Sequence, residues 1–399
     1  MQSLPESLPA LLDPEEIRSR CRFCGLDEEA QSQLLETARR IAAEPGLLRL
    51  AWHIARLSLE YPPLEGARRR LPPLERSLGD RAGCFYLLCA LDFVPRLKAH
   101  HQALGVPEEV TRETCLQIRS YIENFSRGFQ GRLGVYRPQM QWLRSYLHGN
   151  LYFRLGRMEY WAKPMGGAIR VFRNRATGEV AALATEGTRF AADGLVCMTA
   201  DEKPAWVASL TEDEAAIEGC PVSPLGKGLC PRIRLPRTEW SQVLAKGDMV
   251  LDMHIPAGGG MTPEACASSM RRAANFFRSR FPHLKPAAIV CTSWLFHPQL
   301  AAILPSDANL LLYQRELHLF PIATNPRDGI WFIFLQDELD PATAPRETSL
   351  QRSVLDYLAA GNSWKGGGGM FFLLEDLPEI GSQVYRRRWP PKSLASALA

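Results

Sequence analysis

The 399-residue sequence lacks the features of several specialised protein classes. No run approaches the ~20 apolar residues of a membrane-spanning helix. Residues 1–6 have no basic start followed by an apolar stretch, so we expect no signal peptide. The formal net charge is only +4, and both signs are spread along the chain. This balance does not favour nucleic-acid binding, and we interpret the arginine runs 68–70 and 386–388 as solvated charges.

Cysteine is present but not in a pattern that suggests disulfides or a metal. The ten cysteines have scattered spacings, and a chain of this length does not need disulfides to hold a core, which is typical of a reducing, cytoplasmic compartment. Cys21 and Cys24 form the only Cys-x-x-Cys. A structural zinc site needs a second ligand pair, so we expect no metal; a redox or metal role for this pair is the alternative.

Three well-known catalytic or nucleotide-binding motifs are also missing. No Gly-x-Ser-x-Gly elbow occurs, which argues against an α/β-hydrolase. Neither residues 226–228 nor the glycines at 258–260 are followed by the Lys-Ser or Lys-Thr of a Walker loop, and 258–260 does not continue as a dinucleotide fingerprint. The glycine run 366–369 is interpreted as a flexible turn before a strand.

The N-terminal part has helical periodicity. The length predicts two domains, and apolar residues recur at helical spacing from about residue 13 to 149, as in residues 28–43. Residues 84–94 are apolar on nearly all sides, so we expect them to form the buried central helix, kinked or ended by Pro95. We predict a helical domain over residues 1–150 that contains no sheet.

The pattern changes after residue 150 to short apolar segments separated by turns. Asn174 to Gly178 has the composition of a hairpin loop. We therefore predict a mostly antiparallel part over 151–245, within a second domain of residues 151–399. Its expected strands are 155–161, 168–172, 179–184, 206–210 and 232–235.

Residues 246–320 have the pattern of a βαβ core. A strand at 249–255 leads into the glycine loop, and Thr262 followed by Pro263 begins a helix. A strand at 287–292 follows, and a crossover helix of about 18 residues predicts that the two strands are parallel neighbours. The helix is expected to bury one face, formed by Cys266, Met270, Ala273, Phe277 and Phe281.

The C-terminal part, 321–399, is expected to add further strands and a helix. Residues 330–335 and 370–374 are predicted as strands. The helix between them begins at Thr348, which forms a capping box with Gln351, and ends at Gly361.

Candidate chemistry gathers at the βαβ core. Glycines that lead into a helix N-terminus allow backbone N–H groups to approach a phosphate; the alternative is a plain turn. Asp252 and His254 share one face of their strand, so a general base near neutral pH is one interpretation and a solvent-facing polar edge is the other. Cys291 and Ser293 share a face of the next strand, although a nucleophile also needs a positioned base.

This arrangement resembles the acyl-CoA-binding core of the GNAT superfamily of N-acyltransferases. More specifically, the chain resembles bacterial acyltransferase-domain proteins that have a helical N-terminal domain and a GNAT-like C-terminal domain. The resemblance spans most of the chain and is carried by residues 146–157, 254–258 with 262–265, 293–295 with 298–300, and 349–352.

The resemblance implies a V-shaped opening between the two central parallel strands, with acyl-CoA in it. The pyrophosphate would lie on the N–H groups of residues 258–262, and the acyl carbonyl near Asp252 and His254. Tyr313 is the candidate general acid, or else a packed aromatic residue. Ile255 stands where superfamily members tend to have Gln or Arg. The implied cofactor-binding residues are Ile255, Ala257, Gly258, Gly259, Gly260, Met261, Thr262 and Ser293.

We therefore expect an α/β (α+β) protein with a helical N-terminal domain packed on a GNAT-like mixed sheet with flanking helices. The expected function is transfer of an acyl group from acetyl-CoA or another acyl-CoA to a small-molecule amine, without a metal. The expected catalytic residues are Asp252, His254 and Tyr313. The alternative is a non-catalytic ligand-binding or scaffolding protein on the same fold.

Overall fold

The computed structural model describes residues 8–60, 74–325, 327–336 and 338–395. By its internal contacts the chain forms two compact units. The first comprises Met1–Tyr160 with Ile255–Gly259, and the second comprises Trp161–His254 with Gly260–Ala399. The segment that contains two of the loop glycines is thus part of the first unit, although it lies about 100 residues further along the chain.

The first unit is helical, as the sequence predicts. Between residues 8 and 150 the described residues contain no strand, and a short strand, β1 (Tyr152–Leu155), follows them. Aspartates cap the first two helices. The Asp13 side chain accepts hydrogen bonds from two backbone N–H groups at the start of α1, and the Asp27 side chain accepts one at the start of α2. The helices are α1 (Pro14–Cys24), α2 (Glu28–Ala43), α3 (Pro45–Leu59), α4 (Glu75–Leu78), α5 (Ala82–Leu91), α6 (Phe93–Ala103), α7 (Glu108–Cys115), α8 (Gln117–Gly128) and α9 (Arg137–Trp142).

Helix α5 is the buried centre of this unit, which confirms the prediction for the apolar segment. Every one of its residues is buried, and it contacts α1, α2, α3, α8 and α9. It ends at Leu91, before Pro95. A proline ring collides with the carbonyl of the residue four positions earlier, which here is Leu91. Pro95 therefore lies in the first turn of α6, where its missing N–H costs no helical hydrogen bond.

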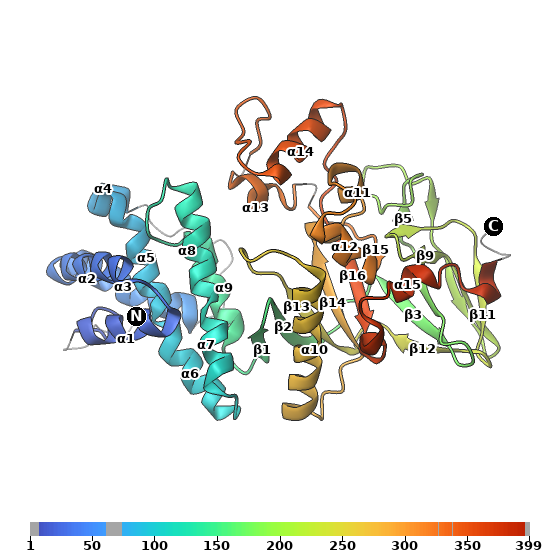
Figure 1. Ribbon diagram of the computed structural model, residues 1–399, viewed down its shortest axis with the longest axis horizontal. Helices are drawn as coiled ribbons and strands as arrows, with labels where there is room; N and C mark the ends of the chain where they lie inside the picture. Colours follow the sequence, from blue (N-terminus) through green and yellow to red (C-terminus); the bar gives the residue numbers. More distant parts are fainter. Residues whose placement is uncertain (1–7, 61–73, 326, 337, 396–399) are drawn as a thin grey trace. The chain divides into compact units, whose positions relative to one another are not determined.

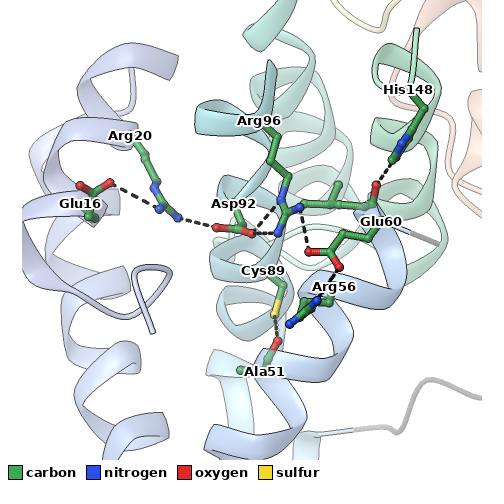
Figure 2. Close-up of polar contacts among 10 residues, drawn as sticks. Glu16, Arg20, Ala51, Arg56, Glu60, Cys89, Asp92, Arg96 and His148 are labelled. Carbon is green, nitrogen blue, oxygen red and sulfur yellow. Dashed lines mark hydrogen bonds and ion pairs between the residues drawn. The ribbon is translucent and has the colours of Figure 1, made fainter. Parts of the chain in front are cut away.

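A chain of charged side chains of alternating sign joins the helices around α5 (Figure 2). At its centre, Asp92 accepts hydrogen bonds from Arg20 at 3.2 Å and from Arg96 at 2.9 Å. The Arg20 side chain is only 5% exposed and that of Asp92 15%. Because each buried charge has a partner of opposite sign, the network avoids the cost of isolated ions in the core. Its members in order are Glu16, Arg20, Asp92, Arg96, Glu60 and Arg56.

The second unit contains a central mixed sheet and smaller antiparallel sheets (Figure 1). Within this unit the central sheet has the order β13-β14-β16-β15, with β13 (Met249–His254), β14 (Ala288–Ser293), β16 (Gly368–Leu373) and β15 (His318–Phe320). All strand pairs recorded between 169 and 244 are antiparallel, which confirms that prediction. They involve β3 (Ile169–Asn174), β4 (Val180–Ala184), β5 (Arg189–Phe190), β6 (Trp206–Val207), β7 (Leu210–Glu212), β8 (Ala216–Gly219), β9 (Pro221–Ser223), β10 (Lys227–Gly228), β11 (Ile233–Pro236) and β12 (Trp240–Leu244).

The predicted βαβ core is confirmed. Strands β13 and β14 are parallel neighbours, and α10 (Pro263–Arg280) connects them. Thr262 caps this helix through a hydrogen bond from the Ala265 N–H at 3.3 Å. The face predicted to be buried is buried in full, from Cys266 to Phe281. Burying this apolar stripe fixes the helix against the sheet, since each large side chain contributes roughly 1.5–3 kcal/mol.

Three local predictions are wrong. Residues 330–335 form helix α13 (Ile330–Phe334) rather than a strand; a short apolar run does not distinguish the two by periodicity. Residues 155–161 are not one strand, because a turn at Gly156, which has φ +79°, separates β1 from β2 (Met158–Pro164). Finally, Gly368 and Gly369 belong to β16 and not to a flexible turn.

Helix α13 belongs to a separate helical cluster that is inserted between β14 and β16. Its apolar side chains pack with those of α11 (Leu300–Ile303), α12 (Asn309–Glu316) and α14 (Ser349–Ala359). Helices α13 and α14 lie together outside the central sheet (Figure 1). The predicted capping box of Thr348 and Gln351 begins α14. The cluster buries its own core, which explains why the apolar run at 330–334 is helical.

Candidate functional site

The two parallel strands of the core part from each other near their carboxyl ends. Their pairing runs from Val250 opposite Ala288 to Asp252 opposite Val290, and it does not continue to the strand ends at His254 and Ser293. Backbone groups beyond the last pair are no longer used by this ladder. The recorded pairing therefore ends before the strands do, at the end of the sheet where the resemblance implied an opening.

A cavity of about 660 Å³ lies in the second unit at this position. Side chains from both parallel strands line it, together with the end of β2 and the loops that follow β2 and β15. Its size falls within the ~300–1,000 Å³ of small-molecule sites. The lining residues are 163–168, 185, 187–189, 196, 197, 250, 252, 290–292 and 320–323.

Asp252 and Lys163 form an ion pair at the wall of this cavity. The Asp252 side chain is 26% exposed and that of Lys163 40%. Burial raises the pKa of Asp252 above its ordinary value, and the ammonium group of Lys163 and the nearby His254 oppose that shift. A carboxylate with a raised pKa is a better proton acceptor than an ordinary aspartate, because basicity rises with pKa.

His254 lies two residues beyond Asp252 on β13, which gives it the same side of the strand. It is half-buried and close enough for its charge to act on Asp252. The structure therefore brings together the two predicted residues that the strand pattern had placed on one face.

Cys291 and Thr292 face the same cavity from β14. Burial raises the pKa of the Cys291 thiol well above its ordinary value, and the negative charge of Asp252 adds to this shift. A thiol in this state is protonated and a poor nucleophile. Cys291 therefore lines the cavity without the lowered thiol pKa of an activated nucleophile.

The other predicted residues lie elsewhere. Tyr313 is fully buried in α12, and its hydroxyl is directed at the sulfur atoms of Met270 (3.3 Å) and Met253 (3.7 Å). This is the packed-aromatic alternative. Ser293 accepts the Leu295 N–H and so begins a short 3-10 turn. Its hydroxyl is therefore engaged in local structure.

The glycine loop has the backbone conformation that requires glycine. The φ angles of Gly258, Gly259 and Gly260 are +81°, +55° and +29°. Other residues pay roughly 1–2 kcal/mol for this left-handed region. A Cβ on Gly258 would also lie 2.9 Å from Oε2 of Glu123, whereas open space surrounds the Cβ positions of Gly259 and Gly260.

Residues of the first unit hold the beginning of this loop in place. Arg157 donates a hydrogen bond to the carbonyl oxygen of Pro256 at 3.0 Å. Ser120 on α8 donates one to the carbonyl oxygen of Ala257 at 3.4 Å. Both of these hydrogen bonds are accepted by backbone carbonyl oxygens, so neither of them uses a backbone N–H group of the loop.

The first turn of α10 offers fewer donors for an anion than the sequence pattern suggested. Pro263 has no N–H, and the Thr262 side chain occupies the Ala265 N–H. Glu264 also places a carboxylate in this turn, which disfavours a second negative charge nearby. Any phosphate at the loop would depend mainly on N–H groups before the helix.

Lys163 and the β2 loop were not among the residues predicted from sequence. Lys163 is the second-last residue of the short strand β2, and the residues next to it in the sequence form no recognisable motif. No sequence pattern indicates this pairing, because Lys163 and Asp252 are 89 positions apart and only the fold brings them together. The cavity-lining residues of β14 could have been found, since they follow the predicted strand pattern.

The cysteine pair of the first helix is buried. Cys21 and Cys24 lie on α1, and burial raises the pKa of Cys21 to about 12. Within the described ranges there is no group of three or more His, Cys, Asp or Glu side chains with the arrangement of a metal site. In the part of the chain that the structure describes, no helix combines the length and the apolar character that crossing a bilayer requires.

Comparison with known proteins supports this architecture. No curated protein matches the sequence. Among solved structures, an acyltransferase mutant in complex with octanoyl-CoA is 20% identical with a TM-score of 0.58, and the match covers 94% of this chain and 91% of that one. An acyltransferase in complex with decanoyl-CoA and teicoplanin is 22% identical, with the same TM-score and coverage. An acyltransferase in complex with CoA and 10C-teicoplanin is 22% identical with a TM-score of 0.56, covering 90% and 88%.

Two family models match the sequence. The N-acyltransferase N-terminal domain matches residues 15–149, and the GNAT-like C-terminal domain matches residues 152–371, more than half of the chain. Both domains occur in the order that the resemblance implied. The chain therefore belongs to the family of proteins with a GNAT-like C-terminal domain, preceded here by an N-acyltransferase N-terminal domain.

Proposed function

We propose that this protein transfers an acyl group from acyl-CoA to an amine. The observation that carries the proposal is the cavity where β13 and β14 part, with Asp252 at its wall. Membership of a family with a GNAT-like domain supports the reaction class. The similar structures were solved with octanoyl-CoA and decanoyl-CoA, one of them also with teicoplanin. By analogy, the co-substrate here is an acyl-CoA and the acceptor a small molecule.

In the proposed reaction Asp252 acts as the general base. The amine nitrogen attacks the thioester carbonyl carbon, the carbon–sulfur bond breaks, and CoA leaves as its thiol. The proton lost by the amine passes to the carboxylate of Asp252, directly or through a water molecule. His254, on the same side of the strand, is the alternative acceptor. Holding both substrates in one cavity contributes through orientation.

Lys163 has a positioning role in this proposal. Its ammonium group opposes the effect of burial on the pKa of Asp252. Lys163 thereby favours the ionised carboxylate that a general base requires, while burial keeps Asp252 more basic than an ordinary aspartate.

The glycine loop is proposed to bind the CoA pyrophosphate through backbone N–H groups of residues 258–262. The left-handed φ angles of three successive glycines support this, because turn conformations of this kind can form anion-binding concavities from backbone N–H groups. Ile255 and Ala257, which precede the glycines, contribute backbone groups in this proposal. Ser293 and Tyr313 have no part in it.

A non-catalytic ligand-binding protein on the same fold is the second candidate. Ile255 supports it, because this position tends to carry Gln or Arg in the superfamily. The Thr262 cap and Pro263 support it too, since they reduce the donors at the helix start. Both candidates bind acyl-CoA or a related ligand, and they differ in turnover.

The test begins with calorimetric titration of acetyl-, octanoyl- and decanoyl-CoA into the full chain. We expect binding of at least one of them; absence of binding at ~1 mM would contradict the acyltransferase proposal. Release of the CoA thiol is then measured with a panel of primary amines. We expect Asp252→Asn to lower kcat roughly 10²- to 10⁴-fold while the acyl-CoA Kd stays within about twofold. Binding without thiol release from any amine would favour the second candidate.

A further inference from the structure

Arg386 has a charge that nothing in the described residues neutralises directly. It lies on α15 (Val384–Arg387) and is half-buried. Within the described ranges its guanidinium makes no recorded hydrogen bond or ion pair, and its Nε atom is fully buried without a partner. Burial, followed by the charge of Arg315, lowers the pKa of Arg386 to about 10. The group remains charged at neutral pH, but in a place that disfavours the charge.

Arg315 approaches Arg386 from the adjacent helix α12, which contacts α15 (Figure 1). One Arg315 nitrogen donates to the carbonyl oxygen of Ser306 at 2.7 Å, and no carboxylate among the described residues forms an ion pair with it. The two arginines therefore lie on helices that contact each other, and the charge of Arg315 disfavours the charge of Arg386. Such an arrangement costs folding energy unless something negative lies between them.

The carboxylate of Glu316, whose charge acts on Arg386, is already engaged. Glu316 attracts Arg386, but its Oε2 accepts the N–H groups of Gly381 at 2.7 Å and Gln383 at 3.0 Å. These bonds fix the loop that leads into α15 and hold the carboxylate away from an ion pair. His318 of β15 also lies near Arg386, and burial lowers its pKa to about 3, so it is neutral at pH 7.

The other two arginines of the run behave differently. Arg387 and Arg388 both form ion pairs with Glu379. From the sequence we interpreted the whole run as solvated charges, which is wrong for the half-buried Arg386. The same three-residue run therefore contains two neutralised side chains and one for which the described residues provide no ion-pair partner.

We infer that Arg315 and Arg386 form a binding site for a phosphate-type oxyanion. A planar guanidinium matches two oxygens of a phosphate at once, and two of them surround one anion with charge-assisted hydrogen bonds. The anion would remove the repulsion between the arginines and give the buried Nε of Arg386 an acceptor. The phosphate is either a free ion or a group of a larger ligand. Under the proposed function, one such group is the 3′-phosphate of CoA.

The experiment measures the melting temperature and phosphate affinity of the full chain. Inorganic phosphate is titrated at constant ionic strength, with chloride as the balancing ion. We expect saturable stabilisation of the wild type, and at least about tenfold weaker phosphate binding for Arg386→Gln and for Arg315→Gln. Arg387→Gln is the matched control, because it removes the neighbouring charge of the same helix, and it should bind phosphate like the wild type.

The sign of the stability change separates a binding site from a structural role. In phosphate-free buffer Arg386→Gln should melt at the same temperature as the wild type or higher, because it removes an uncompensated charge. In saturating phosphate the order should reverse. A lower melting temperature by the same amount in both buffers would overturn the inference. So would equal phosphate affinity in the wild type, Arg386→Gln and Arg315→Gln.

A second arm identifies the source of the phosphate and does not depend on turnover. CoA and dephospho-CoA, which lacks the 3′-phosphate, are titrated into the wild type and Arg386→Gln. If CoA supplies the group, the wild type prefers CoA, the preference shrinks in the variant, and CoA competes with phosphate. If the ligand is a free phosphate, the variant changes only phosphate binding. Failure of the acyltransferase proposal would leave the phosphate result unaffected.

Discussion

The charged network of the helical unit and the arginine pair of the second unit use the same residue types in opposite ways. Around α5, six ionised side chains alternate in sign, and each has a partner (Figure 2). At α12 and α15, two guanidiniums approach each other and the nearby Glu316 is bound to backbone N–H groups. In the first arrangement every charge has a neighbouring charge of opposite sign. In the second arrangement the proposed anion would supply that opposite charge.

The cavity at β13 and β14 lies between these extremes. Among the described residues, Asp252 forms one ion pair, with Lys163, and it remains partly exposed to the cavity. Lys163 and His254 oppose the effect of burial on the pKa of Asp252, while the open side leaves the carboxylate accessible. Counting partners around a half-buried charge therefore distinguishes the network, the cavity and the arginine pair.

The largest expected effect tests the completeness of the network. Asp92→Asn removes the carboxylate between Arg20 and Arg96 and leaves the nearly buried Arg20 with Glu16 at 3.4 Å as its remaining partner. We expect the free energy of unfolding to fall by about 3 kcal/mol, near the lower end for a broken buried pair. Urea denaturation measures it.

Arg18→Met is the matched control, because it breaks an ion pair with Glu15 whose carboxylate side chain is 81% exposed. Its effect should not exceed about 0.5 kcal/mol. Equal losses for the two variants would show that burial does not set the energetic weight of these pairs, and the comparison would fail.

A smaller effect tests the glycine loop. Gly260→Val places a side chain in open space at φ +29°, and Gly361→Ala does so at φ +84° after α14. Both variants should lose roughly 1 kcal/mol of stability through backbone strain. If the loop binds pyrophosphate, only Gly260→Val should also weaken acyl-CoA binding, by at least tenfold or about 1.4 kcal/mol. Melting temperature and calorimetric Kd are measured on both.

A loss of stability with unchanged affinity in Gly260→Val would contradict the phosphate role of the loop. The loop would then be a structural turn that Arg157 and Ser120 hold in place.

The smallest effect concerns pH and the single partner of Asp252. Burial raises the pKa of Asp252, so the ionised base is lost as the pH falls through a value above that of an ordinary aspartate. The acid limb of the kcat–pH profile should therefore lie at a higher pH than the pKa of an ordinary aspartate. Lys163 lowers this pKa, so Lys163→Met should raise it further and move the limb to higher pH. If the acid limb of the kcat profile lies at the same pH in the wild type and in Lys163→Met, Asp252 is not the titrating base.

Much of the architecture was determined by the sequence. Periodicity predicted the helical first part and the buried α5, because an apolar stripe or an all-apolar segment must be covered. The crossover length predicted the parallel β13 and β14. The position of Asp252 and His254 on one side of a strand followed from its two-residue repeat. Each of these predictions depends on local geometry, which the residues of one short segment determine.

Only the tertiary structure decided the rest. The apolar run 330–334 became a helix because the inserted cluster offered it a helical core. Gly366 and Gly369 look alike in sequence, but Gly366 has a left-handed φ of +75°, whereas Gly369 lies in β16, where a Cβ would come within 2.2 Å of the ring of Phe320. Lys163 forms an ion pair with Asp252, 89 positions away, and the charge of Arg315 acts on Arg386, 71 positions away. The energy of a charge depends on its burial and its neighbours, and distant parts of the chain supply both.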